Sequence, residues 1–185
     1  MKTTYVDIDR NELAAMFAKR CFKVGVEIGV DQGKYAEVLC RANPGLKLYC
    51  VDPWKIYNQY ADIKDPQDME GRYQRAVKRL APYNCVIIRE SSMAAVKKFE
   101  PDSLDFVYID GNHAYEYVLS DLKEWTKRVK PGGIVSGHDY TTRKHKYVGY
   151  AVSKAVDFYL ESEGWIEEFF VCTKPIKSTW YFVKK

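Results

Sequence analysis

Short apolar runs alternate along most of this chain with longer segments in which apolar residues recur every three or four positions. The short runs have the length and composition of buried β-strands, and the longer segments have the period of amphipathic helices. In chain order they read KVGVEIG, KYAEVLCRA, KLYCVD, GRYQRAVKRLA, CVIIRE, SMAAVKKF, SLDFVYID, YEYVLSDLKEWTKRV and IVSGH. This alternation predicts β–α–β crossovers, and therefore a mostly parallel sheet with helices on both faces.

The C-terminal part of the chain has a different pattern. A helix is expected near 148–163, followed by the runs EEFFVC and STWYFVK with only KPIK between them. A parallel crossover takes about a dozen residues or more, so these two strands must be antiparallel. We therefore predict an α/β fold with a doubly wound, seven-stranded Rossmann-like sheet, mostly parallel, that ends in a C-terminal antiparallel hairpin.

The length of the chain favours one domain over residues 1–185, because 185 residues of which 46% are hydrophobic can bury a sizeable core. Residues 1–21 are expected to form an N-terminal helical extension. The connection 53–69, PWKIYNQYADIKDPQDM, is longer than the usual strand-to-helix loop of about 2–6 residues. Its aromatic residues Trp54, Tyr57 and Tyr60 make it either a lid over a ligand or a surface loop anchored by its own side chains.

Charge and cysteine content narrow the class of protein. The formal net charge is +4, and the one compact basic stretch, RKHK at 143–146, is more typical of a solvated loop than of a nucleic-acid site. The five cysteines form no CxxC pair, which indicates small core residues in a reducing compartment. The sequence shows no secretory signal, and no apolar run approaches the ~20 residues of a membrane span. We expect a cytoplasmic protein without membrane association.

Polar groups follow each of the five predicted parallel strands. In sheets of this kind ligands bind at the carboxyl ends of the strands, near the point where the strand order reverses. The groups are Glu27, Gly29, Asp31 and Gly33; Asp52; Glu90, Ser91 and Ser92; Asp110 and His113; and His138 and Asp139. Because the strand interiors are apolar, this convergence predicts a ligand site at that edge of the sheet.

The first strand-to-helix turn does not fit two common nucleotide-binding loops. A P-loop has four residues between its glycines and then Lys-Ser/Thr, whereas three residues separate Gly29 from Gly33 and Lys34 precedes Tyr35. A dinucleotide site has GxGxxG, whereas this turn reads ExGxxxG. The acidic Glu27 suits a ligand with a positive or hydrogen-donating group better than a phosphate. The alternative is a tight turn that binds no ligand.

Asp52 and the serines after the third strand add to this picture. A carboxylate at the end of the second strand can accept both hydroxyls of a ribose, although Asp52 can instead open a Pro-Trp turn. Ser91 and Ser92 are placed either as a helix N-cap or at the edge of an adenine ring. Together these groups indicate a ribonucleoside with a cationic or amino-acid-like tail and no phosphate.

Three segments in the same order resemble the class I methyltransferases that use S-adenosyl-L-methionine. VEIGVDQG resembles their first motif, YCVDPW their second-strand acid, and FVYIDGNHAYEYVLSDLKEWTKRVKPGGIVSGHDY their fourth-to-fifth-strand block. The similarity spans roughly residues 22–185 and implies a single methyltransferase domain with S-adenosyl-L-methionine as cofactor. The cofactor contacts that it implies are Glu27, Gly29, Asp31, Gly33, Asp52, Glu90, Ser91, Ser92 and Asp110.

Within that class, IDGNHAYE…PGG…GHDY resembles the catechol- and macrocin-type small-molecule O-methyltransferases, the family 24-like group. The resemblance implies a divalent cation, Mg²⁺ or another, held by Asp110 and Asp139, which lowers the pKa of a substrate hydroxyl. Two positions depart from the pattern. Tyr140 replaces an amide ligand, and His113 replaces a catalytic lysine. We therefore predict His113 as general base, acting with Asp110, and His138 as a further metal ligand. Alternatively, His113 only hydrogen-bonds its loop and His138 is a buried strand-end residue.

The sequence thus predicts methyl transfer to a hydroxyl of a small molecule or sugar. Alternatives are a methyltransferase acting on RNA ribose or another nucleophile, and a non-catalytic nucleoside-binding relative. The last predicts loss of the strand-end acids, which are present. Base methylases that attack exocyclic amines usually carry [DNS]-P-P-[YFW] where IDGNH stands here, so a nucleic-acid partner is disfavoured. The expected partner is a small-molecule acceptor, and the oligomeric state is open, with a homodimer as one alternative.

Overall fold

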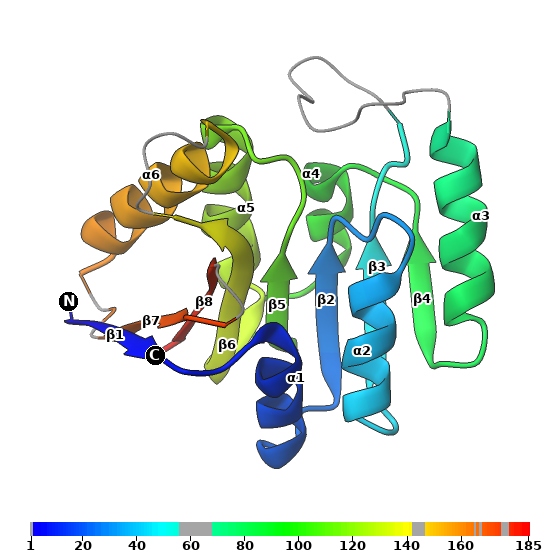
Figure 1. Cartoon of the computed structure of the whole chain (residues 1–185), viewed down its shortest axis with the longest axis horizontal. Coiled ribbons are helices and arrows are strands. Elements are labelled where there is room, and N and C mark those ends of the chain that lie inside the picture. The colour runs from blue at the N-terminus through cyan, green and yellow to red at the C-terminus, as the bar shows by residue number, and fades with distance from the viewer. Residues whose placement is uncertain (1, 56–67, 142–146, 165, 167, 175–177) are drawn as a thin grey trace.

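The structure, a computed structural model, describes residues 2–55, 68–141, 147–164, 166, 168–174 and 178–185 (Figure 1). The strands are β1 (Lys2–Val6), β2 (Val24–Ile28), β3 (Lys47–Val51), β4 (Cys85–Ile88), β5 (Leu104–Ile109), β6 (Val129–Tyr140), β7 (Glu168–Cys172) and β8 (Ser178–Val183). The helices are α1 (Arg10–Lys19), α2 (Lys34–Ala42), α3 (Met69–Leu80), α4 (Ser92–Ala95), α5 (Tyr115–Thr126) and α6 (Tyr147–Ser162).

The strands form one sheet in the order β1-β7-β8-β6-β5-β2-β3-β4. Strands β2, β3, β4, β5 and β6 pair in parallel, whereas β8 is antiparallel to both of its neighbours, β6 and β7. The chain runs outward from β2 to β4 and then returns to β5, on the other side of β2. The strand order therefore reverses between β2 and β5, which is where ligands bind in open parallel sheets. The predicted mostly parallel α/β fold with an antiparallel C-terminal pair is confirmed.

The sheet has one strand more than the seven predicted, because β1 adds to its outer edge. This strand pairs in parallel with β7, from Lys2 opposite Glu168 to Val6 opposite Cys172. The segment predicted as a helical extension therefore contains a strand as well as α1. No apolar run marks the strand, since its side chains are exposed or half-buried along its whole length. Its pairing depends on a partner at the other end of the chain, which local patterning does not reveal.

Helices cover both faces of the sheet (Figure 1). Helices α1, α2 and α3 pack on one face, and α4, α5 and α6 pack on the other. Alternate side chains of β5 show the division, because Phe106 and Tyr108 join the first core while Val107 and Ile109 join the second. The doubly wound arrangement is confirmed. None of the helices that the structure describes is both long and apolar enough to cross a membrane.

Two predictions fall wholly or partly outside the described residues. In the connection 53–69, Tyr57 and Tyr60 lie outside the described residues, whereas Trp54 is described. The basic stretch 143–146 also lies outside the described residues.

Candidate active site

The first turn is shaped by backbone contacts between β2, β5 and the start of α2. Gly29 has a φ of +85°, and a Cβ at this position would lie 2.0 Å from the carbonyl oxygen of Asp110. Gly33, the N-cap of α2, has a φ of +74°, and its Cβ would lie 3.2 Å from the Leu80 side chain. Both positions require glycine for the chain itself to pack. The tight-turn interpretation therefore accounts for both glycines, and Gly29 also faces a cavity described below.

Glu27 lies within β2 and is only 2% exposed. Burial, and then repulsion from Asp110, raise the pKa of its carboxyl well above the usual value. Its Oε2 atom has no hydrogen-bond partner among the described residues. The turn thus stands directly above a buried acidic group.

Asp52 joins the loops that follow β2 and β3. Its Oδ2 accepts the backbone N–H of Asp31 at 3.0 Å, and its Oδ1 accepts that of Trp54 at 2.7 Å. The Asp31 side chain turns to Arg72 of α3, with which it forms an ion pair. The Trp54 ring is buried against Tyr73, and its Nε1 donates to the Asp31 carbonyl at 2.7 Å. For Trp54, the anchoring role is therefore the one observed.

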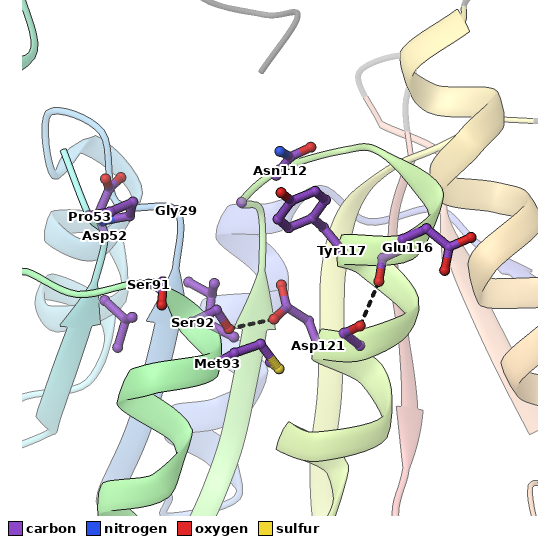
Figure 2. Close-up of a pocket in the computed structure, with 14 residues that line it drawn as sticks. Gly29, Asp52, Pro53, Ser91, Ser92, Met93, Asn112, Glu116, Tyr117 and Asp121 are labelled. Atoms are coloured by element: carbon purple, nitrogen blue, oxygen red, sulfur yellow. Dashed lines mark hydrogen bonds between the residues drawn. The ribbon is translucent and has the colours of Figure 1, made fainter. Parts of the chain in front are cut away.

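The three residues predicted as cofactor contacts in the turn after β4 have three different roles. Ser91 is the N-cap of α4 and accepts the Ala94 N–H at 3.3 Å. Ser92 donates its hydroxyl hydrogen to Asp121 of α5 (Figure 2). Glu90 forms an ion pair with Lys98 at 2.7 Å, on the exposed side of the turn.

A cavity of about 550 Å³ lies between these turns, α4 and α5 (Figure 2). Such a volume is typical of small-molecule and cofactor sites. The residues that line it are Ile28, Gly29, Val51, Asp52, Pro53, Ser91, Ser92, Met93, Gly111, Asn112, Glu116, Tyr117, Ser120 and Asp121. Four predicted cofactor contacts, Gly29, Asp52, Ser91 and Ser92, are among them. For Glu27, Asp31, Gly33, Glu90 and Asp110, which lie outside this lining, a cofactor contact stays a prediction.

Asp121 is a cavity residue that the sequence reasoning missed. It is 4% exposed, and burial raises the pKa of its carboxyl to about 7, against the opposing effect of the Ser92 hydrogen bond. Its position carried a signal, because it lies on the apolar stripe of α5 between Val118 and Trp125, where a carboxyl group is out of place.

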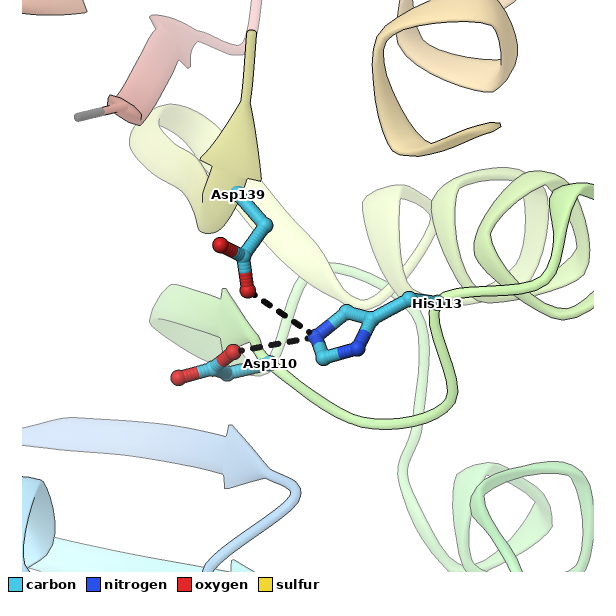
Figure 3. A group of neighbouring side chains, drawn as sticks. All are labelled: Asp110, His113 and Asp139. Atoms are coloured by element: carbon cyan, nitrogen blue, oxygen red, sulfur yellow. Dashed lines mark hydrogen bonds and ion pairs between the residues drawn. The ribbon is translucent and has the colours of Figure 1, made fainter. Parts of the chain in front are cut away.

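A second group of side chains forms where β5 and β6 end (Figure 3). Asp110, His113 and Asp139 each offer a ligand atom, and these atoms lie within 4.8 Å of one another. His113 Nε2 is 3.4 Å from Asp110 Oδ1 and 3.2 Å from Asp139 Oδ2. Asp139 has a φ of 59°, a strained conformation that non-glycine residues often adopt at functional sites. We call these three residues the acidic–histidine cluster.

His138 and Tyr140, which flank Asp139 in the sequence, contact different residues. His138 is outside the cluster, with its Nδ1 3.3 Å from Asp139 Oδ2. Burial opposes the charged form of His138, but Asp139 and Asp110 outweigh it and raise the pKa of the imidazole. The Tyr140 hydroxyl donates to Asp157 of α6 at 2.9 Å, away from the cluster. His113 therefore offers the third potential ligand atom of the cluster, and His138 as a ligand stays a prediction.

Solved structures share this fold. The O-methyltransferase TomG from Streptomyces achromogenes, described as involved in tomaymycin synthesis and in complex with SAM, is 16% identical, with a TM-score of 0.65 over 97% of this chain and 82% of that chain. An O-methyltransferase from Bacillus cereus in complex with SAH is 12% identical, with a TM-score of 0.68 over 96% of this chain and 83% of that chain. At these identities the likeness establishes the fold alone.

Two curated relatives are described as uncharacterized proteins. One, from Sinorhizobium fredii (strain NBRC 101917 / NGR234), is 22% identical over 135 residues, which are 72% of this chain and 14% of that protein. The other, from Acanthamoeba polyphaga mimivirus, is 24% identical over 115 residues, which are 62% of this chain and 50% of that protein. The chain thus spans half or less of the length of these relatives.

A protein family described as "Methyltransferase domain" (Methyltransf_24) matches residues 26–140. The matched region includes both the cavity and the acidic–histidine cluster, and it makes up more than half of the sequence. The predicted resemblance is confirmed, and the chain belongs to this methyltransferase family.

Proposed function

We propose that this protein transfers a methyl group from S-adenosyl-L-methionine to a hydroxyl of a small-molecule or sugar acceptor. One observation carries the proposal: a single loop after β5 serves both sites. Gly111 and Asn112 of this loop line the cavity, while Asp110 and His113 belong to the acidic–histidine cluster. A nucleoside in the cavity and an acceptor at the cluster would therefore meet at this loop. The SAM and SAH complexes of the two structural neighbours support the choice of cofactor.

The cavity suits the nucleoside part of S-adenosyl-L-methionine. When bound, this cofactor supplies the methyl group. Each Asp52 oxygen accepts one backbone N–H, and each still has a lone pair with which to accept a ribose hydroxyl. Ile28, Val51 and Pro53 give the same cavity apolar surface against which a flat base can pack. Asp52 thus holds the diol while these residues exclude water from the base.

The acidic–histidine cluster suits a divalent cation, which would lower the pKa of an acceptor hydroxyl bound beside it. Two carboxylates are hard oxygen ligands of the kind that Mg²⁺ prefers. An imidazole as third ligand shifts the preference toward Mn²⁺, Fe²⁺ or Zn²⁺. In this proposal Asp110 and Asp139 neutralise the cation, and His113 completes its protein ligands.

His113 has two candidate roles, and the geometry favours one. A general base needs a free nitrogen lone pair directed at the acceptor hydroxyl. The Nε2 atom instead lies within 3.4 Å of one carboxylate oxygen and 3.2 Å of another, where a shared cation would sit. We therefore favour His113 as ligand over His113 as general base.

The cofactor is tested by calorimetric titration of S-adenosylhomocysteine into the protein, once with Mn²⁺ and once with a chelator. We expect binding in both titrations, because the cavity residues are distinct from the cluster. Formation of S-adenosylhomocysteine in the presence of catechols, other hydroxylated small molecules and sugars then identifies the acceptor. Absence of binding in both titrations would rule out the proposed cofactor.

The cluster is tested by Mn²⁺ titration followed by electron paramagnetic resonance. Asp139→Asn and His113→Ala should each weaken binding about tenfold or more, because each removes a ligand. Tyr140→Phe is the matched control, since Tyr140 neighbours Asp139 in sequence but bonds Asp157. Unchanged Mn²⁺ affinity in His113→Ala, together with lost turnover and an altered pH profile, would restore the general-base role.

A further inference from the structure

The α5 side of the cavity holds a carboxyl group, that of Asp121, for which the proposed reaction has no role. Asp121 Oδ1 accepts the Ser92 hydrogen bond, and Figure 2 shows the other oxygen turned away from Ser92. A Cβ placed on Gly111, another lining residue, would lie 4.0 Å from this Oδ2 atom. No donor from the described part of the chain reaches Oδ2. This atom is therefore available to a ligand in the cavity that donates a hydrogen bond.

The hydrogen bond from Trp125 determines the direction of the hydrogen bond between Ser92 and Asp121. The indole nitrogen of Trp125 can only donate, and it donates to Ser92 Oγ at 2.7 Å. The Ser92 hydroxyl must then donate its own hydrogen bond to Asp121. One oxygen of Asp121 is therefore committed to Ser92. The other oxygen faces the cavity and is an acceptor once the carboxyl is ionised, above its pKa of about 7.

Asp52 and Asp121 lie on opposite sides of the cavity (Figure 2). The lining between them includes Pro53 and Met93, which offer apolar surface. A nucleoside whose ribose hydroxyls are held by Asp52 would extend its base toward Asp121. Any exocyclic group at the far edge of that base would meet Oδ2.

We propose that Asp121 selects the base of the cofactor by accepting a hydrogen bond from the 6-amino group of adenine, and so rejects 6-oxo purines. This inference rests on the proposed function, because it requires an adenosyl cofactor in the cavity. Above the Asp121 pKa of about 7, a 6-oxo group would place a carbonyl oxygen against the carboxylate oxygen, and neither could donate. Sites built around a buried hydrogen bond discriminate strongly against analogues that cannot form it, here by at least about 100-fold.

The test compares S-adenosylhomocysteine with S-inosylhomocysteine by calorimetry at pH 8. The wild-type protein should prefer the adenosyl compound by about 100-fold or more. Asp121→Asn should lose or invert this preference, because Ser92 holds the amide oxygen and the amide nitrogen then faces the cavity as a donor. Glu124→Gln is the matched control, since it removes one charge from the same helix, outside the cavity lining, and should keep the preference.

Several outcomes would overturn the proposal. One is a wild-type protein that binds S-adenosylhomocysteine but does not discriminate; another is an Asp121→Asn variant with the wild-type preference. Absence of wild-type binding would overturn the proposed function, and this inference with it. If Asp121→Asn does not give a folded protein by circular dichroism, Ser92→Ala decides. Loss of the serine frees the carboxyl to rotate and should lower the preference about tenfold, so an unchanged preference would contradict the proposal.

Discussion

The carboxylates of the cavity and of the acidic–histidine cluster are held in different ways. Both oxygens of Asp52 accept backbone N–H groups, so the fold itself fixes that side chain. Asp110 and Asp139 instead converge on one imidazole, that of His113. Main-chain donors persist through pH changes and side-chain substitutions, whereas two carboxylates around a histidine repel one another whenever the histidine is neutral. The cavity is thus organised in advance, whereas the charge of the cluster would be balanced by the cation that we propose there.

Asp110→Asn should have the largest effect and should separate the two regions. It removes one negative ligand of the proposed cation, so we expect Mn²⁺ binding to be lost and turnover to fall by about 1,000-fold. Affinity for S-adenosylhomocysteine should stay within about threefold, because Asp110 does not line the cavity. Turnover and calorimetry measure the two quantities. A parallel loss of cofactor affinity would mean that the two regions are one coupled site.

Asp52→Ala should have the converse effect. Loss of the acceptor for both ribose hydroxyls should weaken S-adenosylhomocysteine binding by about 100-fold, with Mn²⁺ affinity unchanged. Asp52→Asn is the intermediate variant, since it keeps one acceptor oxygen. If Asp52→Ala binds S-adenosylhomocysteine as tightly as the wild type, Asp52 does not hold the ribose hydroxyls.

Asp121→Asn should change how stability depends on pH. The raised pKa of the Asp121 carboxyl means that the folded protein holds its proton up to about pH 7, whereas the unfolded chain releases it near the ordinary aspartate pKa of 3.8. The wild-type fold therefore loses stability as pH rises from about 4 to 7, and the variant lacks this loss. We would measure the free energy of unfolding in urea at pH 5.5 and at pH 8. From the lower to the higher pH, the variant should become more stable relative to the wild type by about 2 kcal/mol. A gain in the opposite direction would contradict the raised pKa.

Tyr140→Phe should have the smallest effect. It removes the hydrogen bond to Asp157, so we expect a loss of about 1 kcal/mol in the free energy of unfolding. Mn²⁺ affinity and turnover should match the wild type, since the hydroxyl points away from the cluster. If either falls more than about threefold, Tyr140 contributes to the site after all.

The sequence was most informative at the ends of the strands. Asp52, Asp110 and Asp139 could be placed at one edge of the sheet because an apolar run shows where each strand ends. Asp121 could not be placed there, because it lies on a helix, and the facing of that helix depends on how it packs. The direction of Tyr140 was equally hidden, since the positive φ of Asp139 turns the chain just before it. Strand β1 depends on pairing with β7, which no local pattern reports.

That pairing also sets an order of events during synthesis. Strand β1 precedes every other strand of the sheet in the chain, so it leaves the ribosome before them, and its partner β7 follows only after most of the sheet has been made. At a typical synthesis rate, β1 waits on the order of ten to thirty seconds with both edges open. Its sequence, KTTYV, is short and only weakly apolar, which limits aggregation during this interval. The outer edge of the sheet is therefore the last part of the fold that can close.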